Sequence, residues 1–121
     1  MDLHFENNGK HAIQAYDQHG VQVDNQRYEE TLLLNATQLI SMLSLKHLLD
    51  LTPAMILDTL ESRPTILIIG HHLSNIYFAP SQLHEFIQQR IGVECMSFAA
   101  ACRTYNILLS DERSVALLLL I

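Results

Sequence analysis

The chain has 121 residues, 49% hydrophobic and 17% charged, so it has the length of one domain and is too apolar to be disordered. Its formal net charge of −6 disfavours contact with nucleic-acid phosphates, no apolar run reaches the roughly 18 residues that span a bilayer, and two cysteines are too few for a disulfide scaffold. We therefore expect one domain over residues 1–121 in the cytoplasm, with neither nucleic-acid binding nor direct membrane insertion.

The first part of the chain, to about residue 35, predicts an antiparallel β meander. Ile13 and Ala15 alternate with polar neighbours, as in a half-buried strand. Gly20 marks a turn because glycine tolerates positive φ. Strands of the same period are expected around residues 21–23 and 28–34.

From Thr52 onward the pattern alternates between helix and strand. Thr52 followed by Pro53 predicts a helix start, since threonine caps free amide groups and proline fits the first helical position. Residues 65–70 form a continuous apolar run that ends in glycine, which is typical of a central parallel strand buried on both faces. The next helix begins at Pro80. Its predicted buried side carries Leu83, Phe86, Ile87 and Ile91.

The last third predicts a strand, a helix and a final strand. A short strand is expected at residues 93–95, Ser97 can cap a helix that continues through residue 108, and residues 113–121 form the last strand. Strands that alternate with helices imply right-handed crossovers and a mostly parallel sheet.

The segment from Gly92 to Leu108, which contains the run AACRTYNIL, closely resembles the signature of a family of small α/β domains. The biochemical function of that family is largely unassigned. It includes bacterial and archaeal stand-alone proteins and a mitochondrial assembly factor for respiratory complex I, the NADH–ubiquinone reductase. Weaker similarity lies at residues 28–33, at the strand that ends in Gly70, and at residues 78–80.

The resemblance implies a three-layer α/β fold. A central mixed, mostly parallel sheet of about five strands would have helices on both sides and an N-terminal antiparallel β meander. The chain departs from the family at one place. Where the family commonly has Gly-Thr-Gly after the central strand, this sequence has Gly70, His71 and His72, so two imidazoles replace bare backbone amides that could cradle an anion.

The three residues at 70–72 are the first candidate site. Open α/β sheets bind ligands beyond the carboxyl ends of their strands, and histidine titrates near neutral pH. The alternative is an ordinary polar turn, because a histidine pair without a third ligand is a weak metal signal.

Arg103 is the second candidate, because it follows a run of small residues that lets its helix pack closely on the sheet. An arginine there is either paired internally, with Glu94 or Asp111 as partners by charge, or it faces the loop at Gly70 as a recognition group. The residues that follow it are Thr104, Tyr105 and Asn106, which complete the candidate ligand-binding set. The last two can also be structural: Asn106 can cap or brace a turn, and Tyr105 has a hydrogen-bonding hydroxyl on an apolar ring.

Cys95 and Cys102 lie seven residues apart. This spacing fits neither a C-x-x-C redox pair nor a zinc knuckle, so we expect both to pack as small hydrophobic side chains. The sequence contains no nucleophile elbow, P-loop or G-x-G-x-x-G motif. We therefore assign no catalytic residue, metal ion or cofactor.

Because of the resemblance, the leading hypothesis is a non-enzymatic protein-interaction domain. Such a domain would help to assemble a multi-subunit, membrane-associated complex. The alternative is a small-molecule binder or enzyme with its site at residues 70–72 facing Arg103. A third hypothesis is a homodimer formed through the unusually apolar stretch at residues 39–51, because contiguous exposed apolar area marks interfaces.

Overall fold

The computed structural model describes residues 10–74, 76 and 78–121, and every structural statement below refers to these residues. A three-stranded antiparallel sheet is formed by β1 (Ala15–Tyr16), β2 (Val21–Val23) and β3 (Gln26–Tyr28). A five-stranded sheet is formed by β4 (Leu32–Leu34), β5 (Leu39–Ser41), β6 (Ile66–His71), β7 (Gly92–Ser97) and β8 (Val115–Leu119). The helices are α1 (Pro53–Thr59), α2 (Pro80–Gln88) and α3 (Phe98–Ser110).

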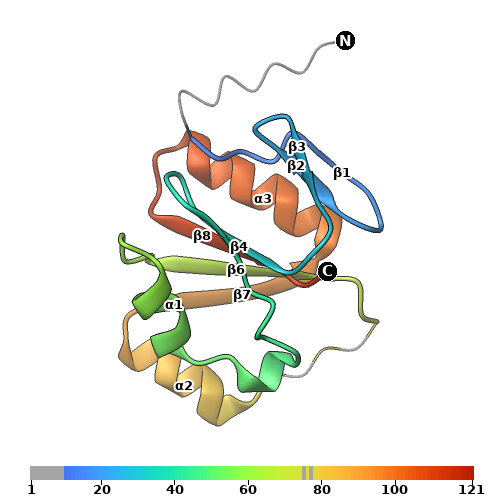
Figure 1. Cartoon of the computed structure of the whole chain (residues 1–121). Helices are drawn as coiled ribbons and strands as arrows, with labels where there is room; N and C mark the ends of the chain where they lie inside the picture. The colour runs from blue at the N-terminus through green and yellow to red at the C-terminus, as the bar shows by residue number, and fades with distance from the viewer. Residues whose placement is uncertain (1–9, 75, 77) are drawn as a thin grey trace.

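The larger sheet is mixed and has the order β5-β4-β8-β6-β7. Strand β6 pairs in parallel with β7 and β8, whereas β4 pairs antiparallel with β8 and β5. Helix α3 and the small sheet cover one face, and α1 and α2 lie on the other (Figure 1). The three-layer α/β architecture with an N-terminal meander is thereby confirmed. None of the described helices combines the length and apolarity that a membrane crossing requires.

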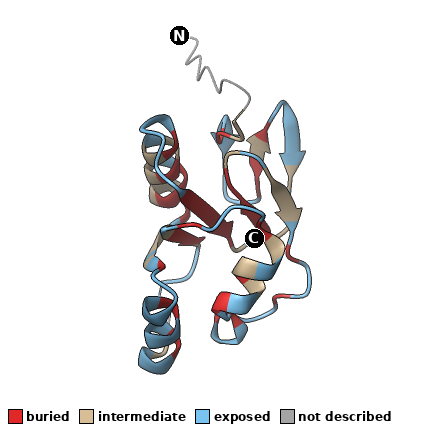
Figure 2. Cartoon of the chain, turned by 90° about the vertical axis from the view of Figure 1, so that its left-hand side faces the viewer, coloured by how far each residue is buried: buried red, intermediate tan, exposed pale blue. Residues whose placement is uncertain are grey.

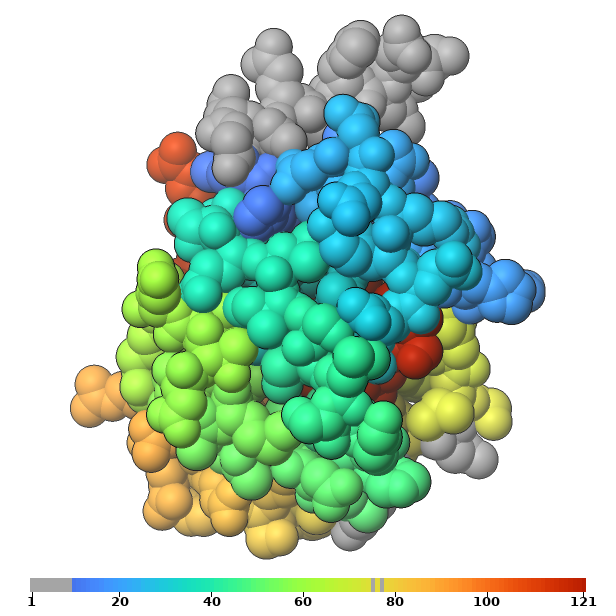
Figure 3. All heavy atoms as spheres, in the orientation of Figure 1, coloured from blue at the N-terminus to red at the C-terminus, as the bar shows by residue number. Residues whose placement is uncertain are grey.

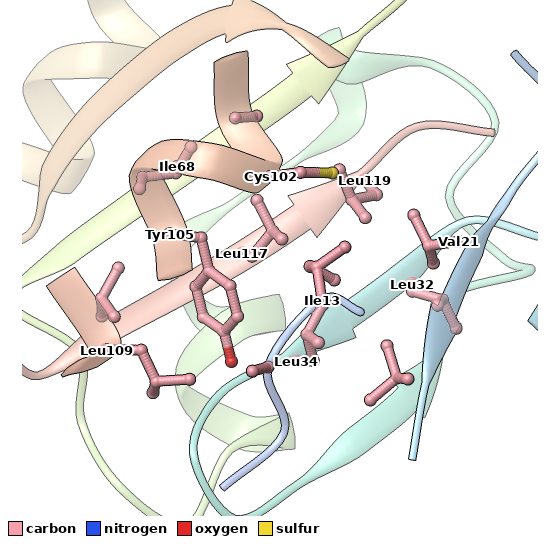
Figure 4. Close-up of a cluster of buried hydrophobic side chains, with 14 of the residues drawn as sticks. Ile13, Val21, Leu32, Leu34, Ile68, Cys102, Tyr105, Leu109, Leu117 and Leu119 are labelled. Carbon is pink, nitrogen blue, oxygen red and sulfur yellow. The ribbon is translucent and has the colours of Figure 1, made fainter. Parts of the chain in front are cut away.

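The sheet separates two hydrophobic clusters, and its central strands are buried on both faces (Figure 2). In β8 the alternation is complete: Leu117 and Leu119 pack toward α3, while Ala116 and Leu118 pack toward α1 and α2. Figure 4 shows the first cluster, where side chains of α3 meet those of β8, β4 and the N-terminal segment. A strand with two buried faces needs a continuous apolar sequence, which explains the runs that mark β6 and β8.

All three helices begin near the residues predicted from the sequence. The Thr52 side chain accepts a hydrogen bond from the Met55 amide, and the Ser97 side chain accepts one from the Ala100 amide. Helix α2 begins at Pro80. Local capping chemistry is therefore sufficient to place these helix starts.

The buried face of α2 differs from the prediction. Gln82 and Phe86 are its buried residues, while Leu83 and Ile87 are 36% and 58% exposed. The physical reason is the Gln82 amide, whose Nε2 donates hydrogen bonds of 2.8 Å to the carbonyl oxygens of both Leu48 and Leu51. These bonds rotate α2 so that the 82–86 stripe faces inward.

The stretch at residues 39–51 contains β5 and a 3₁₀ turn (Leu48–Asp50). Its buried apolar side chains, which join the cluster beneath α1 and α2, are Met42, Leu45, Leu48 and Leu51. Leu43 and Leu49 remain 58% and 55% exposed. Most of this stretch is therefore core, and only part of it is free to meet a partner.

Gly70 lies inside β6 and is buried, as the strand predicted at residues 65–70 implies, and because β6 continues to His71 the glycine is not part of the candidate loop. A Cβ atom at this position would lie 2.7 Å from the Ala101 Cβ and 2.8 Å from Leu119 Cδ2. The glycine is required because α3 approaches the sheet at this point more closely than any larger residue allows.

We predict that Gly70→Ala lowers the free energy of unfolding by about 1–3 kcal/mol, because overpacking a dense core forces neighbours to move. The matched control is Gly92→Ala. A Cβ atom at position 92 would lie 3.6 Å from the nearest atom, the Thr65 carbonyl oxygen, which is an ordinary van der Waals contact. Urea denaturation of both variants checks this prediction, and equal losses of stability would contradict it.

Candidate functional site

The carboxyl ends of β6 and β7 form the edge of the sheet at which the candidate loop lies. His71 is the last residue of β6, and its Nδ1 accepts a hydrogen bond of 3.2 Å from the Leu73 amide. In the neutral imidazole this contact leaves Nε2 as the protonated nitrogen. The His72 ring stacks on Phe98, with ring centroids 4.2 Å apart and an interplanar angle of 18°. The segment from His71 to Leu73 lines two cavities, one on each side of it.

The larger of these, of about 640 Å³, is here called the rim cleft. Its apolar lining side chains are Met42, Leu43, Leu45, Leu48, Leu73, Leu120 and Ile121. The charged and imidazole groups at its edges are Glu29, Glu30, Lys46, His47, His71 and His72. Figure 3 shows a hollow in this region, where the red end of the chain is visible between the blue-green segments and the yellow segment that follows β6. The apolar lining is typical of a site that buries hydrophobic groups.

The second cavity, of about 440 Å³, lies between the β1–β2 hairpin and the start of α3. Asp17 lines it, but this carboxylate accepts two hydrogen bonds, of 2.8 and 2.9 Å, from the Arg27 guanidinium and two more from the amides of His19 and Gly20. The Arg27 hydrogen bonds hold the pKa of Asp17 well below its usual range. Asp17 is therefore an ionised group committed to the hairpin.

Arg103 lines neither of the two cavities beside residues 71–73, and its hydrogen-bond partner is one that the sequence did not indicate. Its Nη1 donates a hydrogen bond of 3.0 Å to the Tyr16 hydroxyl, whereas within the described part of the chain neither Glu94 nor Asp111 forms an ion pair with it. Arg103 lines a third cavity, of about 390 Å³, on the outer side of α3. Tyr16 lines both this cavity and the second one, so the two cavities adjoin at its side chain.

Tyr105 and Asn106 anchor the N-terminal segment to α3. The buried Tyr105 hydroxyl donates a hydrogen bond of 2.7 Å to the His11 carbonyl oxygen, and burial raises its pKa. Asn106 pairs with the backbone of Ile13 in both directions: the Ile13 amide donates to Oδ1 at 2.9 Å, and Nδ2 donates to the Ile13 carbonyl at 2.8 Å. Figure 4 shows Tyr105 beside Ile13 in the core. The polar groups of both side chains are thus used inside the protein.

The remaining candidates for chemistry are the two cysteine thiols and any group of side chains that could bind a metal ion. Both cysteines are unpaired; Cys102 is buried and Cys95 is half-buried. Burial raises the pKa of Cys102 to about 12 and raises that of Cys95 as well, so both thiols are protonated at neutral pH. Within residues 10–74, 76 and 78–121, no group of three or more His, Cys, Asp or Glu side chains is placed to hold a metal ion.

Sequence reasoning named residues 70–72 but missed several of their neighbours. The sequence pattern does not indicate that Phe98, Tyr16, Leu43 and Leu73 lie near these residues. The signal in each case is a large apolar or aromatic side chain, which locates a residue in space only when the topology is known.

Comparison with known proteins yields one family and a set of similar structures. The family described as "Protein of unknown function (DUF498/DUF598)" matches residues 13–120. A structure from Xanthomonas campestris is 28% identical, with a TM-score of 0.78, and the match covers 100% of this chain and 92% of that one. A crystal structure from Bordetella parapertussis is 24% identical, with a TM-score of 0.79 and coverage of 93% and 96%.

A third similar structure, from Bordetella pertussis, is described as an Mth938-like domain. It is 23% identical, with a TM-score of 0.74, and the match covers 99% of this chain and 92% of that one. No curated protein matches the chain at a significant level. These similarities support the α/β fold and a small domain family whose function is uncharacterised.

We predict that Asn106→Ala lowers the free energy of unfolding by about 1–3 kcal/mol, because it leaves the backbone groups of Ile13 without partners. Hydrogen exchange at the Ile13 amide is expected to speed up more than exchange in β6. The control is Thr104→Ala on the same helix. Thr104 is half-buried, and its side chain makes no hydrogen bond with any residue that the structure describes. Equal effects of the two substitutions on Ile13 exchange would show that Asn106 does not anchor this segment.

Proposed function

The chain belongs to the DUF498/DUF598 family of proteins of unknown function, and we propose that it is a non-enzymatic protein-interaction domain. In this proposal the rim cleft holds an apolar segment of a partner protein. The segment would enter beside the end of β6, with its side chains against the leucines of the cleft.

One observation carries the proposal: two leucines at the rim cleft are largely exposed. Leu43 is 58% and Leu73 is 61% exposed, and both line a cavity that is itself mainly apolar. Burial of a leucine side chain contributes about 1.5–3 kcal/mol, so covering both residues is a substantial source of binding energy. Exposed apolar side chains grouped around an apolar cavity are a mark of an interaction site.

The charges around the rim cleft favour a partner segment with mixed flanking charges. Lys46 and His47 lie on the lining, and so do Glu29 and Glu30. Because both signs are present, an apolar segment flanked by an acidic and a basic residue would match the cleft better than a strongly charged one.

The alternative is a small-molecule binder or enzyme at residues 70–72 facing Arg103. Three observations weigh against it. Arg103 lines a separate cavity, the polar groups of Tyr105 and Asn106 hold the N-terminal segment, and the thiol of Cys102 has a raised pKa. His71 and His72 remain in the cleft, where they can contribute hydrogen bonds to a bound peptide.

The resemblance of the run AACRTYNIL to a family that includes a complex I assembly factor suggests the kind of partner. We propose that the domain assists assembly of a multi-subunit, membrane-associated complex by covering an apolar segment of one subunit before that segment reaches its final neighbours. We also place this role in the cytoplasm, where the two unpaired cysteines would stay reduced.

The first experiment identifies the partner and measures its affinity for the domain. A photo-reactive amino acid at Leu43 is cross-linked in cells, and the cross-linked protein is then purified. We expect Leu43→Glu with Leu73→Glu to weaken binding of that protein by about tenfold or more, because each substitution removes the burial of a leucine. The control, Leu83→Glu with Ile87→Glu, changes two exposed apolar residues on α2 and is expected to leave the affinity unchanged.

Three results would contradict parts of this account. Equal loss of affinity in the rim and control variants would remove the rim cleft as the site. Cross-links only to a second copy of the chain, with a dimer abolished by the rim variant, would favour the homodimer. A partner outside any membrane-associated complex would remove the assembly role but leave the interaction domain intact.

A further inference from the structure

The cavity that contains Arg103 is separate from the rim cleft and has its own chemistry. It lies between α3 and the strand segment of residues 13–16, and its volume is about 390 Å³, within the range of small-ligand sites. We propose that this cavity binds a small monocarboxylate with an apolar tail. The proposal does not depend on the protein-interaction function proposed above.

The walls of the cavity suit an apolar tail because most of their polar atoms are already engaged. The Gln14 amide oxygen accepts a hydrogen bond of 2.7 Å from the Asn25 amide. Both amide atoms of Asn106 are hydrogen-bonded to the Ile13 backbone. The Ser110 hydroxyl donates to the carbonyl oxygen of Ile107 at 2.8 Å. The Ile107 side chain itself is 60% exposed at this surface, so a hydrocarbon placed here would cover it without breaking these hydrogen bonds.

The head-group position is defined by Arg103 and Tyr16, which are hydrogen-bonded to each other at 3.0 Å. Among the described residues that line the cavity, Arg103 alone is charged. Its guanidinium uses one Nη1 hydrogen in this bond, which leaves its other N–H groups as donors for a ligand. Because the Tyr16 oxygen accepts that hydrogen, its own hydroxyl hydrogen is free to donate. A planar carboxylate can accept from both groups at once.

The same geometry favours a single negative charge over two. Arg103 is one cation, and the chain has a formal net charge of −6. Ser110, the last residue of α3, also lines the cavity, and the carboxyl end of a helix carries partial negative charge. A doubly charged phosphate would meet more repulsion here than a carboxylate, whose one charge Arg103 neutralises.

The test is a titration of isotope-labelled protein with sodium octanoate, followed by NMR. We expect saturable shifts of the Ile13 and Ile107 methyl groups and of the Arg103 side chain. Arg103→Gln is expected to weaken binding by about tenfold or more, because a hydrogen bond to a charged group is lost. Ile107→Glu should also abolish binding by repulsion. The control is Arg113→Gln. Arg113 is an exposed arginine beyond α3 that does not line the cavity, so this variant should bind octanoate as tightly as the native protein does.

Matched ligands decide the head-group chemistry. Octanol is expected to bind more weakly than octanoate, and octyl phosphate more weakly still. Octanol binding as tightly as octanoate would overturn the proposal, since it would reduce the cavity to an apolar patch. Tighter binding of octyl phosphate, shifts confined to the rim cleft, or equal effects of Arg103→Gln and Arg113→Gln would overturn it as well.

Discussion

The close approach of α3 to β6 at Gly70 is the contact on which the rest of the structure depends. Ala101 of α3 and Leu119 of β8 fill the space that any side chain at position 70 would need. Because the helix lies so near the sheet, the buried Tyr105 and the half-buried Asn106 reach the backbone at His11 and Ile13. The same helix thereby fastens the N-terminal segment, and with it the small sheet, onto the face of the large one (Figure 1).

This packing also decides which polar groups are available for recognition. Tyr105 and Asn106 are used to hold the chain together, so the most distinctive run of the sequence is largely structural. The exposed chemistry lies on either side of it. Beyond the end of β6, leucines and histidines surround the rim cleft, and on the outer side of α3 the guanidinium of Arg103 borders an apolar cavity. Both places combine hydrophobic walls with a small number of polar groups, the usual composition of binding sites.

The features that depend on neighbouring residues could be predicted from the sequence, and the features that depend on distant residues could not. Capping and proline place the start of α1, and continuous apolar runs identify β6 and β8. The inward face of α2 could not be predicted, because it is fixed by bonds from Gln82 to carbonyl groups more than thirty residues earlier. The partner of Arg103 could not be predicted either, since Tyr16 lies 87 positions away. The sequence marks Gly70 as the end of a strand, but it does not show that the glycine leaves space for Ala101 and Leu119.

A double-mutant cycle at Gly70 and Ala101 tests the central contact most directly. The free energy of unfolding is measured for the native protein, Gly70→Ala, Ala101→Gly and the double variant. The account predicts that the double variant is more stable than the sum of the single effects by about 1 kcal/mol or more, because removing the Ala101 methyl group makes room for the new one. Additive effects, within about 0.5 kcal/mol, would show that α3 does not rest on Gly70 and would contradict the account.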